Sequence, residues 1–216
     1  MQHPGKPWLW REDWAHGTIK DTNKGGAIAI WVFAVLWNAI SIPAAFAARP
    51  ELTKGNLAAL LVLLFPLIGI ILLITAIYLT LRMMTFGTST CHLERIPIAP
   101  GSTFRGDIEL NIDTAPENGY RLRIASFHAV TTGSGKNRST NERLLWDQEI
   151  VVAGSAAMRS PTSTRVPFKF TTPPDSHVTD ESDSRSRFFW RLSASAAFPG
   201  VDYGAQFEVP VFRTAE

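Results

Sequence analysis

The sequence predicts an α+β membrane protein in which a two-helix transmembrane hairpin is followed by an all-β antiparallel sandwich. Two apolar runs without a charged residue lie eight residues apart in the first part of the chain. From Thr88 onward, short runs rich in β-branched and aromatic residues alternate with turn-forming segments. We expect a Trp-rich interfacial segment over 1–26, a helical hairpin over 27–84 and a β-sandwich over 88–216.

The two apolar runs predict helices at about 27–48 and 57–82. Because an α-helix rises about 1.5 Å per residue and the hydrocarbon core is roughly 30 Å thick, about 20 residues suffice to cross it. A core helix of a soluble protein is one alternative, although such helices usually carry a polar face. A signal peptide is another for the first run, since Ala45-Phe46-Ala47 has the form of a cleavage site, but the preceding 26 residues include acidic ones.

Lysine and arginine near the helix ends indicate the orientation, because cytoplasmic segments carry an excess of them. Four cations precede the first helix: Lys6, Arg11, Lys20 and Lys24. Two follow the second apolar run, Arg82 and Arg95, and only two, Arg49 and Lys54, occupy the turn. We therefore expect an integral membrane protein with both termini in the cytoplasm.

Few polar groups interrupt the apolar runs. Asn38 is expected to bond across to the partner helix or to another subunit, and Pro43, Pro66 and Gly69 predict kinks. Simple hairpin packing is favoured over a substrate pathway. No ionisable group lies at membrane depth, which gives an ion or proton channel little support.

The segment PWLWREDW places Trp8, Trp10 and Trp14 among charged residues. Indole rings prefer the headgroup layer, where the ring is half buried and the N–H stays hydrated. We therefore expect an interfacial membrane anchor. The alternative is that these rings pack against the β domain or a partner protein, because tryptophan clusters are also favoured binding anchors.

Seven runs in the tail predict strands, without a convincing helix among them. The GSGKNRST stretch is expected to form a hairpin loop, and the DESDSR stretch a solvated loop. The predicted strands lie at 91–98, 104–112, 120–130, 143–152, 166–170, 188–198 and 206–212.

The charge balance of the tail argues against nucleic acid as a partner. Fourteen basic residues stand against fifteen acidic ones from Thr88 onward, and no basic stripe is visible. Affinity for nucleic acid comes mostly from neutralising phosphates, so a nearly neutral domain is a poor candidate.

Apparent chemical motifs do not meet their requirements. The stretch 133–140 lacks the first glycine of a phosphate loop, because position 130 is Val, and Asn137 follows its lysine. Cys91 and His92 are neighbours on a predicted strand and point to opposite faces, so they do not form a nucleophile and base pair. The five histidines have no zinc-ligand spacing. We expect no cofactor, no metal and no catalytic residue.

The end of the chain resembles arrestin-like β-sandwich domains, a form of immunoglobulin-like sandwich. The resemblance rests on VPFKFTTPPDSHV, in which an apolar strand ends at a Pro-containing turn, and on FFWRLSASAAFPGVDYGAQFEVPVF, in which an aromatic-x-Leu-x-Ala-x-Ala strand precedes a final apolar strand. PGSTFRGDIEL is similar to an early strand of that fold. The whole chain also resembles an uncharacterised bacterial membrane-protein family with a domain of unknown function, whose members are expected to carry further sequence before PWLW.

The arrestin-like resemblance implies binding rather than catalysis. Our leading hypothesis is a membrane-anchored, non-enzymatic adaptor or scaffold that presents the sandwich to a protein partner, with sheet edges able to accept a peptide strand. The alternative is an accessory structural subunit of a larger membrane complex, in which Asn38 and the Trp segment line an interface. The lipid bilayer is a partner in both, and an enzyme is the third class considered.

Overall fold

The computed structural model describes residues 6–22, 26–55 and 61–213. The chain divides into a β unit, formed by Met1–Thr22 together with Thr85–Glu216, and a helical unit, Asn23–Met84. The N-terminal segment is thus part of the β unit, although the sequence predicted a separate interfacial segment. The reason is that residues 18–20 pair as a strand with residues 90–92, which follow the helical unit in the chain.

The helical unit contains the two expected helices with different ends. Helix α2 spans Gly26–Thr53, and helix α3 spans Leu64–Phe86 after a 3-10 turn at 61–63. The predicted beginning of the second run, at 57–60, lies outside the described residues. Helix α3 continues past Arg82 to a left-handed glycine, Gly87, because a charge ends an apolar stretch without ending a helix.

Helices α2 and α3 pack in antiparallel fashion through small residues. Ala34 and Ala76 are fully buried, and the Asn38 side chain donates hydrogen bonds to the carbonyls of Ala34 (2.8 Å) and Gly69 (3.0 Å). A Cβ at Gly69 would overlap the Asn38 amide, so this close approach requires glycine. The interhelical bond expected for Asn38 is therefore present.

Pro43 and Pro66 differ in whether they lie where a helical backbone hydrogen bond would be lost. Pro43 lies inside α2, whereas Pro66 falls in the first turn of α3, where backbone N–H groups have no helical partner. The kink expected from Pro66 therefore has no lost hydrogen bond to cause it.

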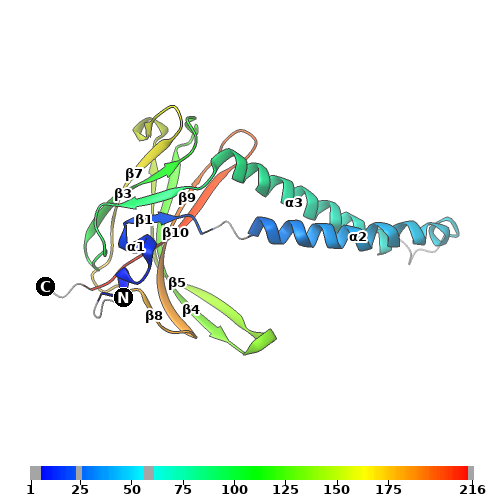
Figure 1. Ribbon diagram of the computed structural model, residues 1–216, viewed down its shortest axis with the longest axis horizontal. Coiled ribbons are helices and arrows are strands. Elements are labelled where there is room, and N and C mark those ends of the chain that lie inside the picture. Colours follow the sequence, from blue (N-terminus) through cyan, green and yellow to red (C-terminus); the bar gives the residue numbers. More distant parts are fainter. Residues whose placement is uncertain (1–5, 23–25, 56–60, 214–216) are drawn as a thin grey trace. The chain divides into compact units, whose positions relative to one another are not determined.

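The β unit consists of two antiparallel sheets, which confirms the sandwich predicted for the tail (Figure 1). All seven predicted strands are present. The first sheet has the order β1 (Thr18–Lys20), β2 (Thr90–Leu93), β3 (Thr103–Leu110), β7 (Thr164–Thr171) and β6 (Met158–Arg159). The second has the order β10 (Tyr203–Val209), β9 (Ser186–Ala196), β4 (Tyr120–Thr132) and β5 (Ser139–Val152).

Strand β8 (Asp180–Asp183) pairs with the first part of β9. It occupies most of the stretch that we expected to be a solvated loop, although all four of its residues are exposed. Its polar sequence gives no strand signal, and the pairing is decided by its neighbour. The β4–β5 connection is the expected hairpin loop, with a 3-10 turn, η4, at Gly135–Asn137.

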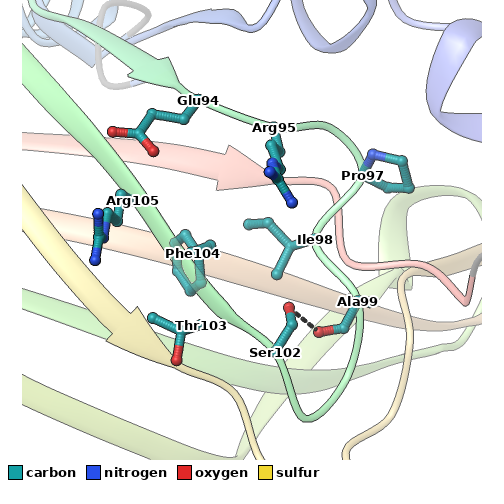
Figure 2. A pocket seen from close by; sticks show the side chains of 9 residues that line it. All are labelled: Glu94, Arg95, Pro97, Ile98, Ala99, Ser102, Thr103, Phe104 and Arg105. Carbon is teal, nitrogen blue, oxygen red and sulfur yellow. Dashed lines mark hydrogen bonds between the residues drawn. The ribbon is translucent and has the colours of Figure 1, made fainter.

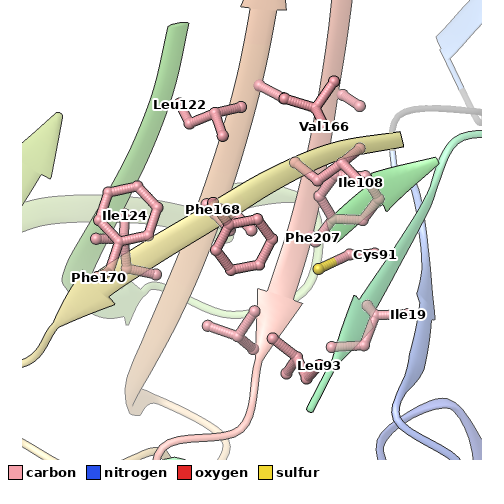
Figure 3. Close-up of a cluster of buried hydrophobic side chains, with 14 of the residues drawn as sticks. Ile19, Cys91, Leu93, Ile108, Leu122, Ile124, Val166, Phe168, Phe170 and Phe207 are labelled. Carbon is pink, nitrogen blue, oxygen red and sulfur yellow. The ribbon is translucent and has the colours of Figure 1, made fainter. Parts of the chain in front are cut away.

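Alternating side chains of both sheets form one core (Figure 3). Phe168 and Phe170 of β7 lie among Ile108, Leu122 and Phe207, and the lone thiol of Cys91 is buried with them. Period-two burial of apolar side chains is what orders these strands, at about 25 cal/mol for each Å² of apolar surface removed from water.

The N-terminal segment contributes η1 (Pro7–Leu9), α1 (Glu12–Ala15) and β1 to the β unit. We call residues 7–22 the N-terminal strap. Strand β1 pairs with β2, with Ile19 opposite Cys91, and Thr22 continues to β10 by donating its backbone N–H to the Gln206 carbonyl (3.0 Å). The strap thus joins an edge of each sheet.

Candidate functional site

Trp14 fixes the strap to the sandwich. Its side chain is 3% exposed, its indole N–H donates to the Glu208 carbonyl (2.9 Å), and its ring meets Phe212 edge-on at 5.9 Å. An interfacial lipid contact is therefore wrong for Trp14. Packing against the β domain, the alternative we considered, describes it.

A charged network closes over Trp14. The Arg11 guanidinium lies 4.1 Å from the Trp14 ring centre and pairs with Asp13 (2.9 Å) and Glu208 (2.8 Å), while Arg187 approaches the other Glu208 oxygen (3.4 Å). Burial alone would lower the pKa of Arg11, but the hydrogen bonds and charges of Asp13 and Glu208 raise it above its ordinary value. Arg11 is therefore a permanent cation within the strap.

The other two tryptophans lie at the surface of the strap. Trp8 is half-buried with its ring 5.7 Å from Phe212, and Trp10 is 57% exposed. For Trp10, the membrane-interface and partner roles stay predictions.

Beside Trp10 lies a cavity of about 420 Å³. Aromatic groups of the strap and Phe212 form one wall, and the acidic residues of β8 form another. Hydrogen bonds from Ser182 hold the pKa of Asp180 below its usual value, so that carboxylate is ionised at neutral pH. We call this cavity the strap pocket; it is lined by Pro7, Trp10, Arg11, Trp14, Thr179, Asp180, Glu181, Ser182 and Phe212.

The fourth predicted residue, Asn38, lies in the helical unit and is 8% exposed. Two aromatic contacts that the sequence did not single out accompany it: the indoles of Trp31 and Trp37 donate to the Thr80 hydroxyl and the Phe65 carbonyl, both at 2.8 Å. The available signal was that Trp31 and Trp37 lie on the same apolar run as Asn38.

The geometry offers little for covalent or metal chemistry. Burial raises the pKa of the Cys91 thiol, and the His92 side chain leaves the strand on the opposite face, as expected. Among the described residues, no group of three or more His, Cys, Asp or Glu side chains is arranged to hold a metal ion. The neutral, buried thiol is a poor nucleophile. Two hydroxyls of the described residues lie beside histidine rings, Ser186 beside His128 at 2.9 Å and Thr18 beside His92 at 3.5 Å, and neither pair lines the strap pocket.

A second hollow, of about 390 Å³, lies where β2 passes into β3 (Figure 2). Glu94, Arg95 and Arg105 lie along it above the apolar side chains of Ile98 and Phe104. The Ser102 hydroxyl donates to the Ala99 carbonyl at 2.6 Å and stabilises the turn at its end. The hollow contains no pair of groups placed for acid–base work.

The edge strands differ in their capacity to accept a peptide. The strap covers β10, and β6 has only two residues, whereas β5 offers a 14-residue edge. The β4–β5 register shifts between Ser126 and Phe127, and a bulge of this kind blunts an edge. We therefore give the strap pocket precedence over strand addition.

These features define an α+β chain in which a two-sheet antiparallel β unit is interrupted by two helices long and apolar enough to cross a membrane. No family model matches the chain, and no curated protein matches it. Among solved structures it is similar to the crystal structure of Spo0M, a sporulation control protein from Bacillus subtilis.

The likeness to Spo0M is partial. It has 13% identity and a TM-score of 0.39, and it covers 58% of this chain and 49% of that protein, so the chain spans about half the length of Spo0M. The fold therefore rests on the strand pairings above. The β unit has the sandwich architecture that the arrestin-like resemblance implies, and membership of the uncharacterised membrane-protein family stays a prediction.

Proposed function

We propose that this chain is a membrane-anchored, non-enzymatic adaptor: α2 and α3 cross the bilayer, and the β unit binds a protein partner at the membrane surface. One observation carries this proposal. The hairpin is inserted between β1 and β2, which are neighbouring strands of one sheet, with Lys20 opposite Thr90. Both attachments of the hairpin therefore enter the same folded unit, as expected of an anchor that holds one domain.

The surface of the helices supports insertion in lipid. Their mutual contact is made by small residues, which is typical of membrane helix pairs, and bulky apolar side chains lie outside it. Such a surface is costly in water and favourable in hydrocarbon. Examples on both helices are Ile28, Val32, Leu36, Ile40, Leu67, Ile70, Ile71 and Ile74, all at least 43% exposed.

Pairing of β1 with β2 supports a hairpin topology with both ends on one side of the bilayer. Strands of one sheet cannot lie on opposite sides of a membrane, so the strap and the tail share a compartment. Placing that compartment in the cytoplasm, beneath a bacterial inner membrane, rests on the excess of Lys and Arg outside the helix turn.

The strap pocket is the surface that we assign to the protein partner. It combines the exposed indole of Trp10 with the carboxylates of Asp180 and Glu181. The Trp10 indole and the Asp180 carboxylate suit a lysine or arginine side chain, whose stem packs on the indole while its charge meets the carboxylate. Arg11 also lines the pocket, but its charge is paired with Asp13 and Glu208, and Glu181 lies 3.5 Å from Arg187.

In the accessory-subunit alternative, Asn38 and the Trp segment would line an interface with another subunit. The Asn38 amide already donates to two carbonyls within the hairpin, and Trp14 is buried in the β unit. The adaptor proposal relies on the strap pocket, a cavity of about 420 Å³ within the β unit, so a specific observation favours it.

Photo-crosslinking in cells tests the adaptor proposal. A photoreactive amino acid at Trp10 should give a defined protein adduct in carbonate-washed membranes. The same group at Met158, another exposed apolar residue of the β unit (61%), should not. Equal adducts at both positions, or an adduct at Trp10 that persists after Asp180 and Glu181 are both changed to Lys, would reject the pocket as the docking site. A chain extracted by carbonate would reject the anchor.

A further inference from the structure

The connection between β9 and β10 begins with five uncharged, apolar residues. Residues 197–201 read Ala-Phe-Pro-Gly-Val, and Asp202 follows them. Ala197, Pro199 and Gly200 are exposed, whereas Phe198 and Val201 are half-buried against the core. The loop therefore presents small apolar groups at the surface while its two larger side chains face the core.

The β9–β10 loop contacts Phe86. Phe86 is the last residue of α3, and its side chain is buried in the core of the β unit. Its ring lies 5.3 Å from those of Phe198 and Tyr203. The loop therefore contacts the residue at which the apolar helix ends.

Helix geometry gives the depth of that contact in a bilayer. Residues 61–82 span about 33 Å at 1.5 Å per residue, close to the roughly 30 Å of a hydrocarbon core. Phe86 lies four residues beyond Arg82, or about 6 Å, which is about the thickness of one headgroup layer. The Phe198 ring lies 5.3 Å from that of Phe86, so the loop is held close to the residue at which the helix ends.

We infer that the β9–β10 loop is a second membrane contact, which inserts its exposed apolar tip into the headgroup layer. This inference rests on the proposed membrane anchor and deepens it. The exposed apolar surface of Ala197 and Pro199 is favoured at that depth, and Asp202 limits further entry because its carboxylate stays hydrated. The contact orients the β unit on the bilayer in addition to tethering it.

Fluorescence of single labels in the full chain tests the inference. The chain, reconstituted in vesicles of phosphatidylcholine and phosphatidylglycerol, carries an environment-sensitive dye at Pro199→Cys or, as a second variant, at Ala197→Cys. Lys136→Cys is the matched control. Tyr120, the first residue of β4, contacts Phe198 of the loop, whereas Lys136 follows the other end of that strand. Strand β4 has 13 residues, so its two ends lie about 40 Å apart. The unchanged chain serves as a labelling blank, since Cys91 is buried.

We expect lipids with a spin label near the headgroup to quench the dye at positions 199 and 197 at least twofold more than at position 136. Ile70→Cys, in the middle of α3, reports on the anchor itself and should be quenched by deeply labelled lipids. Quenching at 70 with equal, low quenching at 197, 199 and 136 would overturn the loop contact and leave the anchor intact. Absence of quenching at 70 would overturn both.

Discussion

At the scale of single residues, Trp14 and Trp10 separate a structural role from a binding role within one segment. Trp14→Ala removes a buried indole and its hydrogen bond to Glu208, and should lower the free energy of unfolding of the β unit by about 3–5 kcal/mol. Trp10→Ala, at an exposed position, should change it by less than about 0.5 kcal/mol. Thermal unfolding followed by the infrared amide band of the strands measures both.

Equal effects of the two substitutions would contradict this placement of the strap. The sequence favoured a lipid anchor for all three tryptophans because indole rings prefer the headgroup layer. Which ring is buried depends on Glu208 and Phe212, nearly 200 residues away, and no local pattern contains that information.

Gly69 and Asn38 form a second residue-scale pair. Gly69→Ala places a methyl group in the space of the Asn38 amide and should destabilise the hairpin by about 1 kcal/mol, as should Asn38→Ala. The second substitution should add little once the first is present, because both remove one interaction. Detergent denaturation followed by helical ellipticity measures the cycle, with Thr75→Ala as an exposed control on α3. Strict additivity would contradict the contact.

Two buried acidic groups, the Cys91 thiol and the Tyr203 hydroxyl, should make the stability of the β unit fall at high pH. Burial raises the pKa of Cys91 and of Tyr203 in the folded protein, so folding favours their neutral forms. The associated stability is complete below the unfolded pKa values, about 8.5 for Cys and 10 for Tyr, and is lost as the pH rises through and beyond them. The free energy of unfolding should fall from about pH 8.5, and Cys91→Ala should delay that fall. An unchanged pH profile in the variant would exclude the thiol as its source.

At the scale of elements, the strap should be indispensable to the β unit and the hairpin dispensable. Replacing residues 23–84 with a short Gly-Ser linker keeps the β1–β2 pairing and should give a folded, water-soluble β unit. A chain beginning at Thr88 lacks Trp14, Ile19 and β1, and should fail to fold cooperatively. Amide exchange and a thermal melt of the two products measure the difference. Equal behaviour would show that the strap is peripheral.

Element ends show where sequence patterns stop being informative. The apolar runs predicted both helices, but α3 continues past Arg82 because nothing before Gly87 opposes helical geometry. The seven predicted strands were recognisable because each lies in a run rich in β-branched and aromatic residues. Strands β1, β6 and β8 were not, since they are two to four residues long and are ordered by the strands beside them.

At the scale of the whole molecule, the pairing of β1 with β2 predicts that residues before and after the hairpin are labelled from the same side. Cys91 is buried and unsuitable as a topology probe, so Lys136→Cys on the exposed β4–β5 loop replaces it. An impermeant maleimide should leave this thiol unmodified in intact cells and react after lysis if the β unit is cytoplasmic. An epitope at the N-terminus should behave identically. Opposite accessibility of the two sites would contradict the shared sheet.

The sequence by itself determined the two apolar helices, the β-rich tail and the lack of an obvious catalytic motif. Each of these is written in composition or in short periodicities, which act within one element. Only the tertiary structure decided that the strap completes the sandwich, that Asn38 is held by Gly69 of the other helix and that the β9–β10 loop meets Phe86. These are contacts between residues distant in the chain, and their free energy depends on which surfaces meet, so no local pattern specifies them.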